Sequence, residues 1–298
     1  MVKLEPLRKA FFKFFKVCQA LISKRSFSFY QTQNFVVEDR AIRLPVANGI
    51  GIDLIGEGKH SLSDLIAWVY DRRTGAFIDV GANVGRVLVA LLRYDRSIPY
   101  VGFDPMIACA RHVDAIIREN GLTDSHSILP VGLSDKSCSK EMFFDSVDDV
   151  SATVVSDARP ARLYRTKCRI ALGVGDDYLS QIPTVAFIKI DAEGSEPRVL
   201  RGLQKTITQH KPVICFEVLP IKELERGTHP LFDIDDDEKR RLLTVRKNLA
   251  EEIKAVLDSY DYEVVKFAEG KMIPGADLAG SSISDYDFVA IPKGYEVP

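Results

Sequence analysis

Three acidic residues of this chain stand at the ends of short apolar runs, where their side chains could bind a ligand. Asp79 lies near the end of the run 77–80, Asp104 follows 100–103, and Asp191 follows 185–190. If these runs are parallel strands, their carboxyl ends meet at one edge of a sheet. A carboxylate there can accept hydrogen bonds from ribose hydroxyls or an amino group, or take a proton from a reacting hydroxyl.

The segment after Asp79 has the spacing Gly81-x-Asn83-x-Gly85. Gly81 allows a sharp backbone turn, and Gly85 allows a ligand or a strand to approach closely, because neither residue has a Cβ atom. The spacing differs from the Gly-x-Gly-x-x-Gly of dinucleotide enzymes. An acid just before the turn disfavours a phosphate but suits a ligand with a positive amino group, such as S-adenosylmethionine. The alternative is a glycine turn that only packs a strand against a helix.

The second acid, Asp104, lies roughly 25 residues after Asp79, as in α/β nucleotide sites. A carboxylate at this position suits a ribose diol, because two hydroxyl donors match a two-oxygen acceptor. Pro105 ends the strand. We therefore expect the loop residues to bind a cofactor together with this acid; the predicted cofactor-binding residues are Asp79, Gly81, Asn83, Gly85, Asp104 and Pro105.

Catalytic candidates gather around the strand predicted at 185–190. Lys189, Asp191 and Glu193 alternate along the chain, and Glu217 ends the next predicted strand. We interpret Asp191 as the group nearest the acceptor, with Lys189 and Glu217 supporting it. Lys189 and Asp191 could instead form a buried ion pair, and Glu193 could cap the following helix. Asp191, Glu193 and Glu217 could also hold a divalent cation, which is not favoured.

The histidines offer one further candidate base. His229, in the segment after the strand that ends at Glu217, could take the proton, although a lone loop histidine is more often only solvated. The remaining histidines are expected at the surface: His60, His112, His126 and His210.

Strands alternate with helical patterns along most of the chain, which predicts a mainly parallel α/β sheet with helices on both faces. The pattern predicts one domain over 61–298. We expect strands at 77–80, 100–103, 128–131, 185–190, 213–218, 262–267 and 288–291, and helices at 61–73, 106–120, 192–208 and 236–259. The piece 135–171 interrupts this alternation, and 142–144 with 153–155 could form an inserted hairpin. Asp176 to Leu179 is expected to make one helical turn.

Residues 1–60 are expected to form an N-terminal extension, with a small β element over 27–55. The first 25 residues predict a basic amphipathic helix. Its apolar residues recur at helical spacing, and its lysines fall on the opposite side: Leu4, Leu7, Phe11, Phe14, Phe15, Cys18 and Ile22, against Lys9, Lys13, Lys16 and Lys24. Such a helix could lie on the inner face of a membrane, or its aromatic face could pack on its own domain.

The composition fits a globular cytoplasmic protein. The 298 residues are 46% apolar and 28% charged, with a net charge of −2, so no overall basic field attracts nucleic acid. The five cysteines are odd in number and include no Cys-x-x-Cys, which favours reduced thiols over disulfides or zinc. No apolar run approaches the roughly 20 residues of a membrane span.

These motifs, in this order, resemble the FkbM-type S-adenosylmethionine-dependent methyltransferases over about residues 62–220. The similarity is carried by Phe77-Ile-Asp-Val-Gly-Ala-Asn-Val-Gly85, Gly102-Phe-Asp-Pro105, Leu133-Ser-Asp135, Ile188-Lys-Ile-Asp-Ala-Glu-Gly-Ser-Glu-Pro-Arg-Val-Leu-Arg-Gly202 and Phe216-Glu-Val218. The resemblance implies a Rossmann-like seven-stranded class I methyltransferase sheet and adds Ser134 and Asp135 to the cofactor site. Many relatives carry Glu at the position of Asp104.

The resemblance also implies an acceptor hydroxyl on a sugar, polysaccharide, lipid or polyketide-like metabolite. Its selection is expected to involve residues 1–60 and 221–261, and a nitrogen acceptor stays open. Two other interpretations remain. One is a nicotinamide-dependent oxidoreductase, which the glycine spacing disfavours and which binding of NAD rather than S-adenosylhomocysteine (SAH) would reveal. The other is a catalytically silent, membrane-associated module that keeps the cofactor fold.

Overall fold

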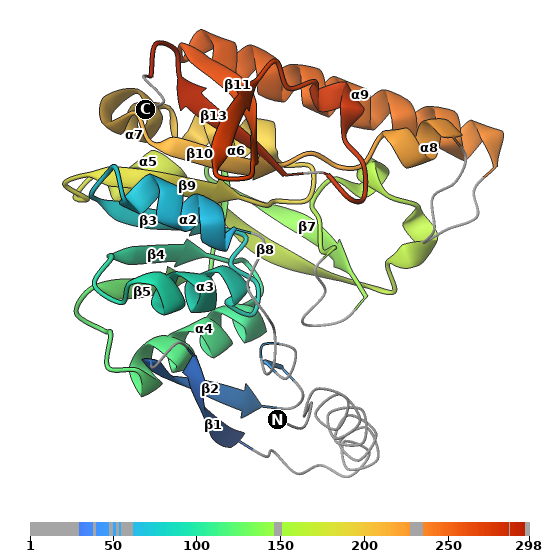
Figure 1. Cartoon of the computed structure of the whole chain (residues 1–298). Helices are drawn as coiled ribbons and strands as arrows, with labels where there is room; N and C mark the ends of the chain where they lie inside the picture. Colours follow the sequence, from blue (N-terminus) through green and yellow to red (C-terminus); the bar gives the residue numbers. More distant parts are fainter. Residues whose placement is uncertain are drawn as a thin grey trace, which may run out of the picture.

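A large central sheet with helices on both faces forms the body of the protein (Figure 1). The computed structural model describes residues 30–37, 40–47, 50–51, 54, 62–145, 151–226, 235–285 and 287–295. The amphipathic helix predicted at 1–25, the helix start at residue 61 and His229 lie outside these residues. None of the described helices is both long and apolar enough to cross a membrane.

The central sheet has eight strands in the order β12-β11-β13-β10-β9-β3-β4-β5. Five of them run parallel: β3 (Ala76–Val80), β4 (Tyr100–Phe103), β5 (His126–Leu129), β9 (Val185–Ile190) and β10 (Val213–Glu217). The antiparallel end holds β13 (Asp287–Pro292), β11 (Tyr262–Ala268) and the short edge strand β12 (Lys271–Pro274). The predicted α/β class is confirmed, and β12 is the strand beyond the expected seven.

Alternate residues of the central strands pack into two separate apolar cores, one on each face of the sheet. Phe77 and Phe187 face one core, and their neighbours Ile78 and Ile188 face the other. The first core is covered by α2 (Ser63–Tyr70), α3 (Arg86–Tyr94) and α4 (Ile107–Glu119). The second is covered by α6 (Glu196–Gly202), α7 (Gln204–His210) and α9 (Asp236–Ser259), as Figure 1 shows. Strands buried on both faces explain the continuous apolar runs of the sequence.

Two predicted elements differ from the structure. The helix expected over 192–208 is divided at Leu203 into α6 and α7. In the interrupting piece, β7 (Cys138–Phe144) pairs with β8 (Thr166–Val174), and β6 (Gly132–Ser134) completes a second sheet of three strands. The hairpin expected between 142–144 and 153–155 is present only as one antiparallel bridge, in which the backbones of Phe143 and Thr153 exchange hydrogen bonds of 2.8 and 3.0 Å. Residues 153–155 form no strand.

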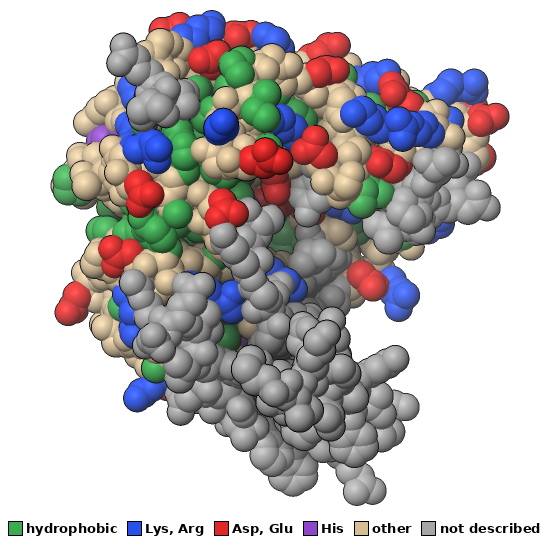
Figure 2. All heavy atoms as spheres, viewed as in Figure 1, with side chains coloured by type: hydrophobic (Ala, Val, Ile, Leu, Met, Phe, Trp, Pro, Cys, Tyr) green, Lys and Arg blue, Asp and Glu red, His purple; other side chains and the backbone are tan. Residues whose placement is uncertain are grey.

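Short elements complete the chain. The 3-10 turns are η2 (Ser156–Ala158), η3 (Ala161–Leu163) and η4 (Leu278–Gly280), and the short helices are α5 (Gly175–Leu179) and α8 (Lys222–Arg226). The turn expected at 176–179 is therefore present as α5. Basic and acidic side chains intermix along the α9 side of the face shown in Figure 2.

The N-terminal β element is a hairpin of β1 (Tyr30–Val37) and β2 (Arg40–Ala47) that docks on α4. Asn120 at the end of α4 exchanges two hydrogen bonds with the Arg43 backbone, at 2.9 and 2.8 Å. The imidazole of His112 lies between the carbonyl oxygens of Pro45 and Val84, at 2.9 and 3.0 Å. His112 and His126 are buried, so their expected surface position is wrong. The domain boundary near residue 60 stays a prediction.

Candidate active site

A cavity of about 590 Å³ opens at the carboxyl ends of β3, β4 and β9. Ligands of open α/β sheets bind at this edge. The cavity wall has a polar part and an apolar part. The polar part includes Asn83, Asp104, Lys189, Asp191, Glu193, Ser195 and Asp287, and Gly81 and Pro105 also line the cavity. The apolar part includes Met142, Val154, Ile170 and Leu172 from the second sheet and the segment beside it.

Asp104 is held in a fixed orientation on this wall. Its Oδ2 accepts a hydrogen bond from the Asn83 amide at 2.7 Å, and its Oδ1 accepts one from the Met106 amide at 2.8 Å. The residue is only 6% exposed, and burial raises the pKa of its carboxyl to about 6. Each carboxylate oxygen can accept a further bond, so this side chain suits a diol in the cavity.

The loop glycines serve the packing of the chain itself. Gly81 has a φ of 80°, and a Cβ atom there would lie 1.8 Å from the carbonyl oxygen of Asp191. Gly85 has a φ of 89° and is the N-cap residue of α3, where a Cβ would lie 3.1 Å from Ile116 Cδ1. Another part of the chain therefore approaches each glycine closely. At Gly81 it is the loop after β9, and at Gly85 it is α4. Asn83 also adopts a positive φ, of 43°.

The other predicted cofactor residues lie away from the wall. Asp79 is fully buried and accepts a hydrogen bond from the Tyr100 hydroxyl at 2.8 Å. Its Oδ1 has no hydrogen-bond partner among the described residues, and burial raises its pKa. Ser134 donates to Asp135 at 3.1 Å; neither residue lines the cavity, whereas Gly132 and Leu133 do. The cofactor-binding roles of Asp79, Ser134 and Asp135 remain predictions.

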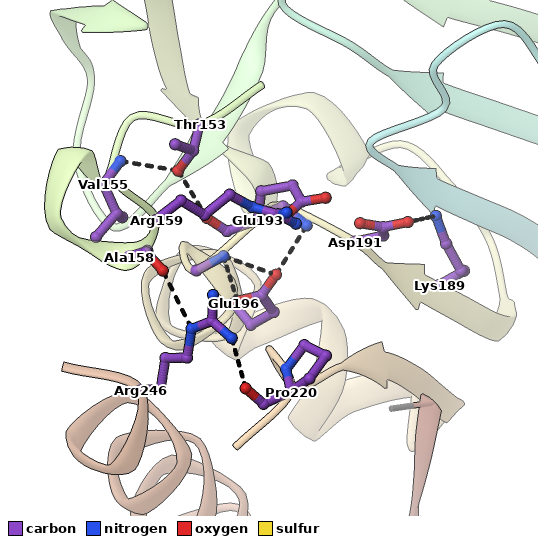
Figure 3. A network of polar contacts seen from close by, with 12 residues as sticks. Thr153, Val155, Ala158, Arg159, Lys189, Asp191, Glu193, Glu196, Pro220 and Arg246 are labelled. Carbon is purple, nitrogen blue, oxygen red and sulfur yellow. Dashed lines mark hydrogen bonds and ion pairs between the residues drawn. The ribbon is translucent and has the colours of Figure 1, made fainter. Parts of the chain in front are cut away.

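Lys189 and Asp191 form an ion pair at the end of β9, with 3.0 Å between Nζ and Oδ2 (Figure 3). Burial lowers the pKa of Lys189, but the carboxylates of Asp191 and Asp79 outweigh that effect and hold it above its usual value. The same pairing outweighs burial at Asp191 and lowers its pKa. The Asp191 side chain is 37% exposed, so this ion pair is also accessible from the cavity.

Glu193 is held by the segment between β7 and β8. Arg159 contacts its Oε2 at 2.5 Å, and the Thr153 hydroxyl donates to its carbonyl oxygen at 2.6 Å (Figure 3). Burial raises the pKa of Glu193 although Arg159 lowers it. The helix-capping role considered for Glu193 is wrong, because α6 has no side-chain cap. Glu196, the first residue of α6, accepts bonds from the backbone amides of Ala192 and Gly194 in the preceding loop, at 2.8 and 3.0 Å.

Asp191, Glu193 and Glu217 converge, with carboxylate oxygens within 4.8 Å of one another. Burial, followed by the two neighbouring carboxylates, raises the pKa of Glu217 well above its usual value. Three oxygens at this spacing match what a divalent cation prefers. However, Lys189 and Arg159 already compensate two of the three charges, so we assign no cation to this cluster.

Two groups on the wall were missed by sequence reasoning. Asp287 begins β13, and its Cα pairs with that of Glu217 across the antiparallel contact with β10. The start of an antiparallel strand lies at the same sheet edge as the ends of the parallel strands. The position of Asp287 just before the apolar run 288–291 could therefore have indicated its place on this wall. Ser195 lines the cavity with a buried hydroxyl that has no hydrogen-bond partner among the described residues.

A family model matches most of this chain. The family model described as Methyltransferase FkbM domain matches residues 79–264. Among solved structures, an FkbM methyltransferase from Methylobacillus flagellatus KT is similar at 15% identity and a TM-score of 0.40, over 73% of this chain. This chain spans only 43% of that protein.

Two further solved structures match this chain over most of the length of both proteins. The SAH-bound methyltransferase of Podospora anserina has 12% identity and a TM-score of 0.44, over 81% of both chains. The O-methyltransferase of Bacillus cereus in complex with SAH has 12% identity and a TM-score of 0.42, over 80% of this chain and 84% of that one. No curated protein matches the chain.

Proposed function

The chain belongs to the methyltransferase FkbM domain family, and we propose that it transfers a methyl group from S-adenosylmethionine to a hydroxyl of a sugar, polysaccharide or polyketide-like metabolite. One observation carries this proposal. The cavity at the carboxyl edge of the sheet has Asp104, fixed by the glycine loop, and the ion-paired Asp191 on the same wall.

The residues present fit the cofactor. Asp104 offers free lone pairs to the ribose hydroxyls, and it is oriented before any ligand arrives. Asp79 lies beneath the loop with one oxygen that has no partner among the described residues, so a water or an amino group at the loop would satisfy it. S-adenosylmethionine, when bound, supplies an electrophilic methyl group.

The protein's own residues must then align the acceptor and remove its proton. A hydroxyl is a poor nucleophile, so a carboxylate on the cavity wall should accept its proton. Holding the hydroxyl in line with the methyl group supplies much of the rate through proximity. The apolar wall of Met142, Ile170 and Leu172 suits the body of a ligand and excludes water.

The proposal is tested in two steps. Calorimetry should show that the protein binds SAH and not NAD, which separates a methyltransferase from an oxidoreductase. Transfer of tritiated methyl from S-adenosylmethionine to hydroxyl compounds should then be measured with and without EDTA. Activity that is lost with EDTA and restored by magnesium would show that the transfer needs a cation, and Asp191, Glu193 and Glu217 would then be its candidate ligands.

The second candidate is a catalytically silent, membrane-associated module. It rests on the basic amphipathic pattern of residues 1–25 alone. Tight SAH binding without methyl transfer to any acceptor would support it. Under the leading proposal the protein is cytoplasmic, with contact to the inner face of a membrane through the same segment, and it needs no nucleic-acid partner.

A further inference from the structure

Four acidic side chains stand on the cavity wall, and three of them are already engaged. Asp104 accepts two backbone hydrogen bonds, Asp191 is paired with a lysine, and Glu193 is paired with an arginine. Asp287 is the exception: within the described part of the chain, its carboxylate makes no hydrogen bond and no ion pair. Its backbone carbonyl accepts a bond from Lys266 at 2.7 Å, which leaves the side chain available.

The position of Asp287 places it with the other catalytic candidates. β13 lies between β10 and β11, and the register pairs Asp287 with Glu217 at the end of β10. Lys189 is close enough for the charge of Asp287 to raise its pKa. The carboxylate of Asp287 therefore faces the same end of the cavity as the ion pair of β9.

The proton affinities of the wall carboxylates also differ. Burial, reinforced by Asp191, raises the pKa of Asp287 to about 6, although Lys189 and Lys266 lower it. Asp191 is shifted in the opposite direction by its lysine. A general base works best when its pKa is near the working pH, because it must be ionised and yet bind a proton well. An ion-paired aspartate is a weaker base than an unpaired one in the same cavity.

We infer that Asp287 is a catalytic residue, the carboxylate that accepts the acceptor's hydroxyl proton. This inference rests on the proposed function. As the oxygen forms its bond to the methyl carbon, the carbon–sulfur bond breaks and its electron pair stays on sulfur, which becomes a neutral thioether. The hydroxyl proton passes to the Asp287 carboxylate and then to solvent. Asp191 is already paired with Lys189 and leaves this proton to Asp287.

The first test needs no acceptor. The full-length protein is treated at pH 6 with a water-soluble carbodiimide and glycine methyl ester, and labelled peptides are mapped by mass spectrometry. We expect Asp287 to be labelled, because its carboxyl is unpaired and open to the cavity. Asp285 is the positive control for the chemistry, since it is exposed. Labelling of Asp285 without Asp287 would overturn the inference.

The second test compares Asp287→Asn with Asp285→Asn, in which the replaced acid pairs with Lys266 at 2.6 Å. Tritiated methyl transfer is measured with methyl glucoside, catechol and glycerol. Asp287→Asn should lower kcat by about 10²–10⁴-fold, as loss of a general base does, and leave SAH affinity unchanged. Asp285→Asn should be near wild type. The rise of kcat with pH through about 6 should disappear in Asp287→Asn and persist in Asp287→Glu.

The outcomes separate this inference from the proposed function. If the wild type binds no SAH or methylates none of the three hydroxyl compounds, the proposed methyl transfer to hydroxyl acceptors fails, and the base role of Asp287 fails with it. If the wild type is active and Asp287→Asn keeps its rate and its pH profile, the proposed function stands and Asp287 is not the base.

Discussion

At the scale of single residues, the site is built from acids whose partners differ. Asp104 is restrained by two backbone amides, Asp191 by a lysine, Glu193 by an arginine, and Asp287 by no side chain among the described residues. Each restraint fixes a different property: orientation for Asp104, charge for Asp191 and position for Glu193. Similar side chains on one wall are thereby suited to different tasks.

Asp104 gives the sharpest residue-scale prediction. Asp104→Ala should weaken SAH binding by about 1–3 kcal/mol, because two buried ribose hydroxyls would lose their acceptor. Calorimetry measures this loss, and Asp124→Ala, which alters an exposed aspartate outside the cavity wall, is the control. Unchanged SAH affinity in Asp104→Ala would remove Asp104 from the cofactor site.

At the scale of elements, the loop after β3 packs closely against the loop after β9 at Gly81. Gly81→Ala should cost at least the roughly 1–3 kcal/mol of a strained backbone, because the added Cβ meets the Asp191 carbonyl and the φ is positive. Gly121→Ala is the matched control: its φ is 66°, but nothing lies within 4 Å of the added Cβ. Urea denaturation should show a much larger loss for Gly81→Ala. Equal losses would mean that the contact with Asp191 is unimportant.

Many of the helices and strands were predictable, because the local sequence patterns agree with the rules for parallel sheets. The five parallel strands and α9 follow from apolar runs and helical periodicity, and so does the meeting of Asp104 with Asp191 at one edge. The pairing of β7 with β8 was not predictable, because it joins segments separated by a long connection whose partner no local signal specifies. The burial of His112 was missed because docking of the N-terminal hairpin covers it.

The hydrogen bonds that fix the site were also beyond local reasoning. Arg159 reaches Glu193 from a segment 34 positions away. The partner of such a long side chain depends on how loops close, and the sequence carries no periodic signal for that. The ion pair considered for Lys189 and Asp191 is present. It could be predicted because an ionisable group inside an apolar strand needs a nearby counter-charge.

At the scale of the whole molecule, buried carboxyls should make stability fall as pH rises. Burial raises the pKa of Glu196 to about 8 and that of Asp104 to about 6, above their unfolded values. The folded state then binds more protons than the unfolded state, so this contribution is complete below about pH 4 and is lost as pH passes 6 to 8. A tenfold difference in proton affinity between the folded and unfolded states corresponds to about 1.4 kcal/mol. Urea midpoints should drop between pH 6 and 8.

A single substitution checks the origin of that slope. Glu196→Gln keeps an oxygen for the Ala192 amide and cannot ionise, so it should flatten the pH dependence. Glu252→Gln, which alters an exposed pair with Arg201, is the control and should keep the wild-type slope. An unchanged slope in Glu196→Gln would place the effect elsewhere.

The N-terminal segment provides a second test at this scale. If residues 1–25 form a basic amphipathic helix, the protein should co-sediment with anionic vesicles, and high salt should release it, because screening weakens the lysine contacts. Deletion of residues 1–25 should abolish sedimentation and preserve SAH binding. An insoluble deletion variant would instead indicate that the segment covers the core.

The insertion of β13 between β10 and β11 has a consequence for biosynthesis. The cofactor loop and the ion pair of β9 leave the ribosome long before residue 287 is translated. A nascent chain can therefore acquire a cofactor pocket while the gap between β10 and β11 is still open and both strands expose unpaired backbone groups. Stalled or prematurely terminated chains would bind the methyl donor beside a sheet that lacks β13. Such chains would lack Asp287 and catalytic activity, and their exposed strands would be substrates for chaperones and proteases.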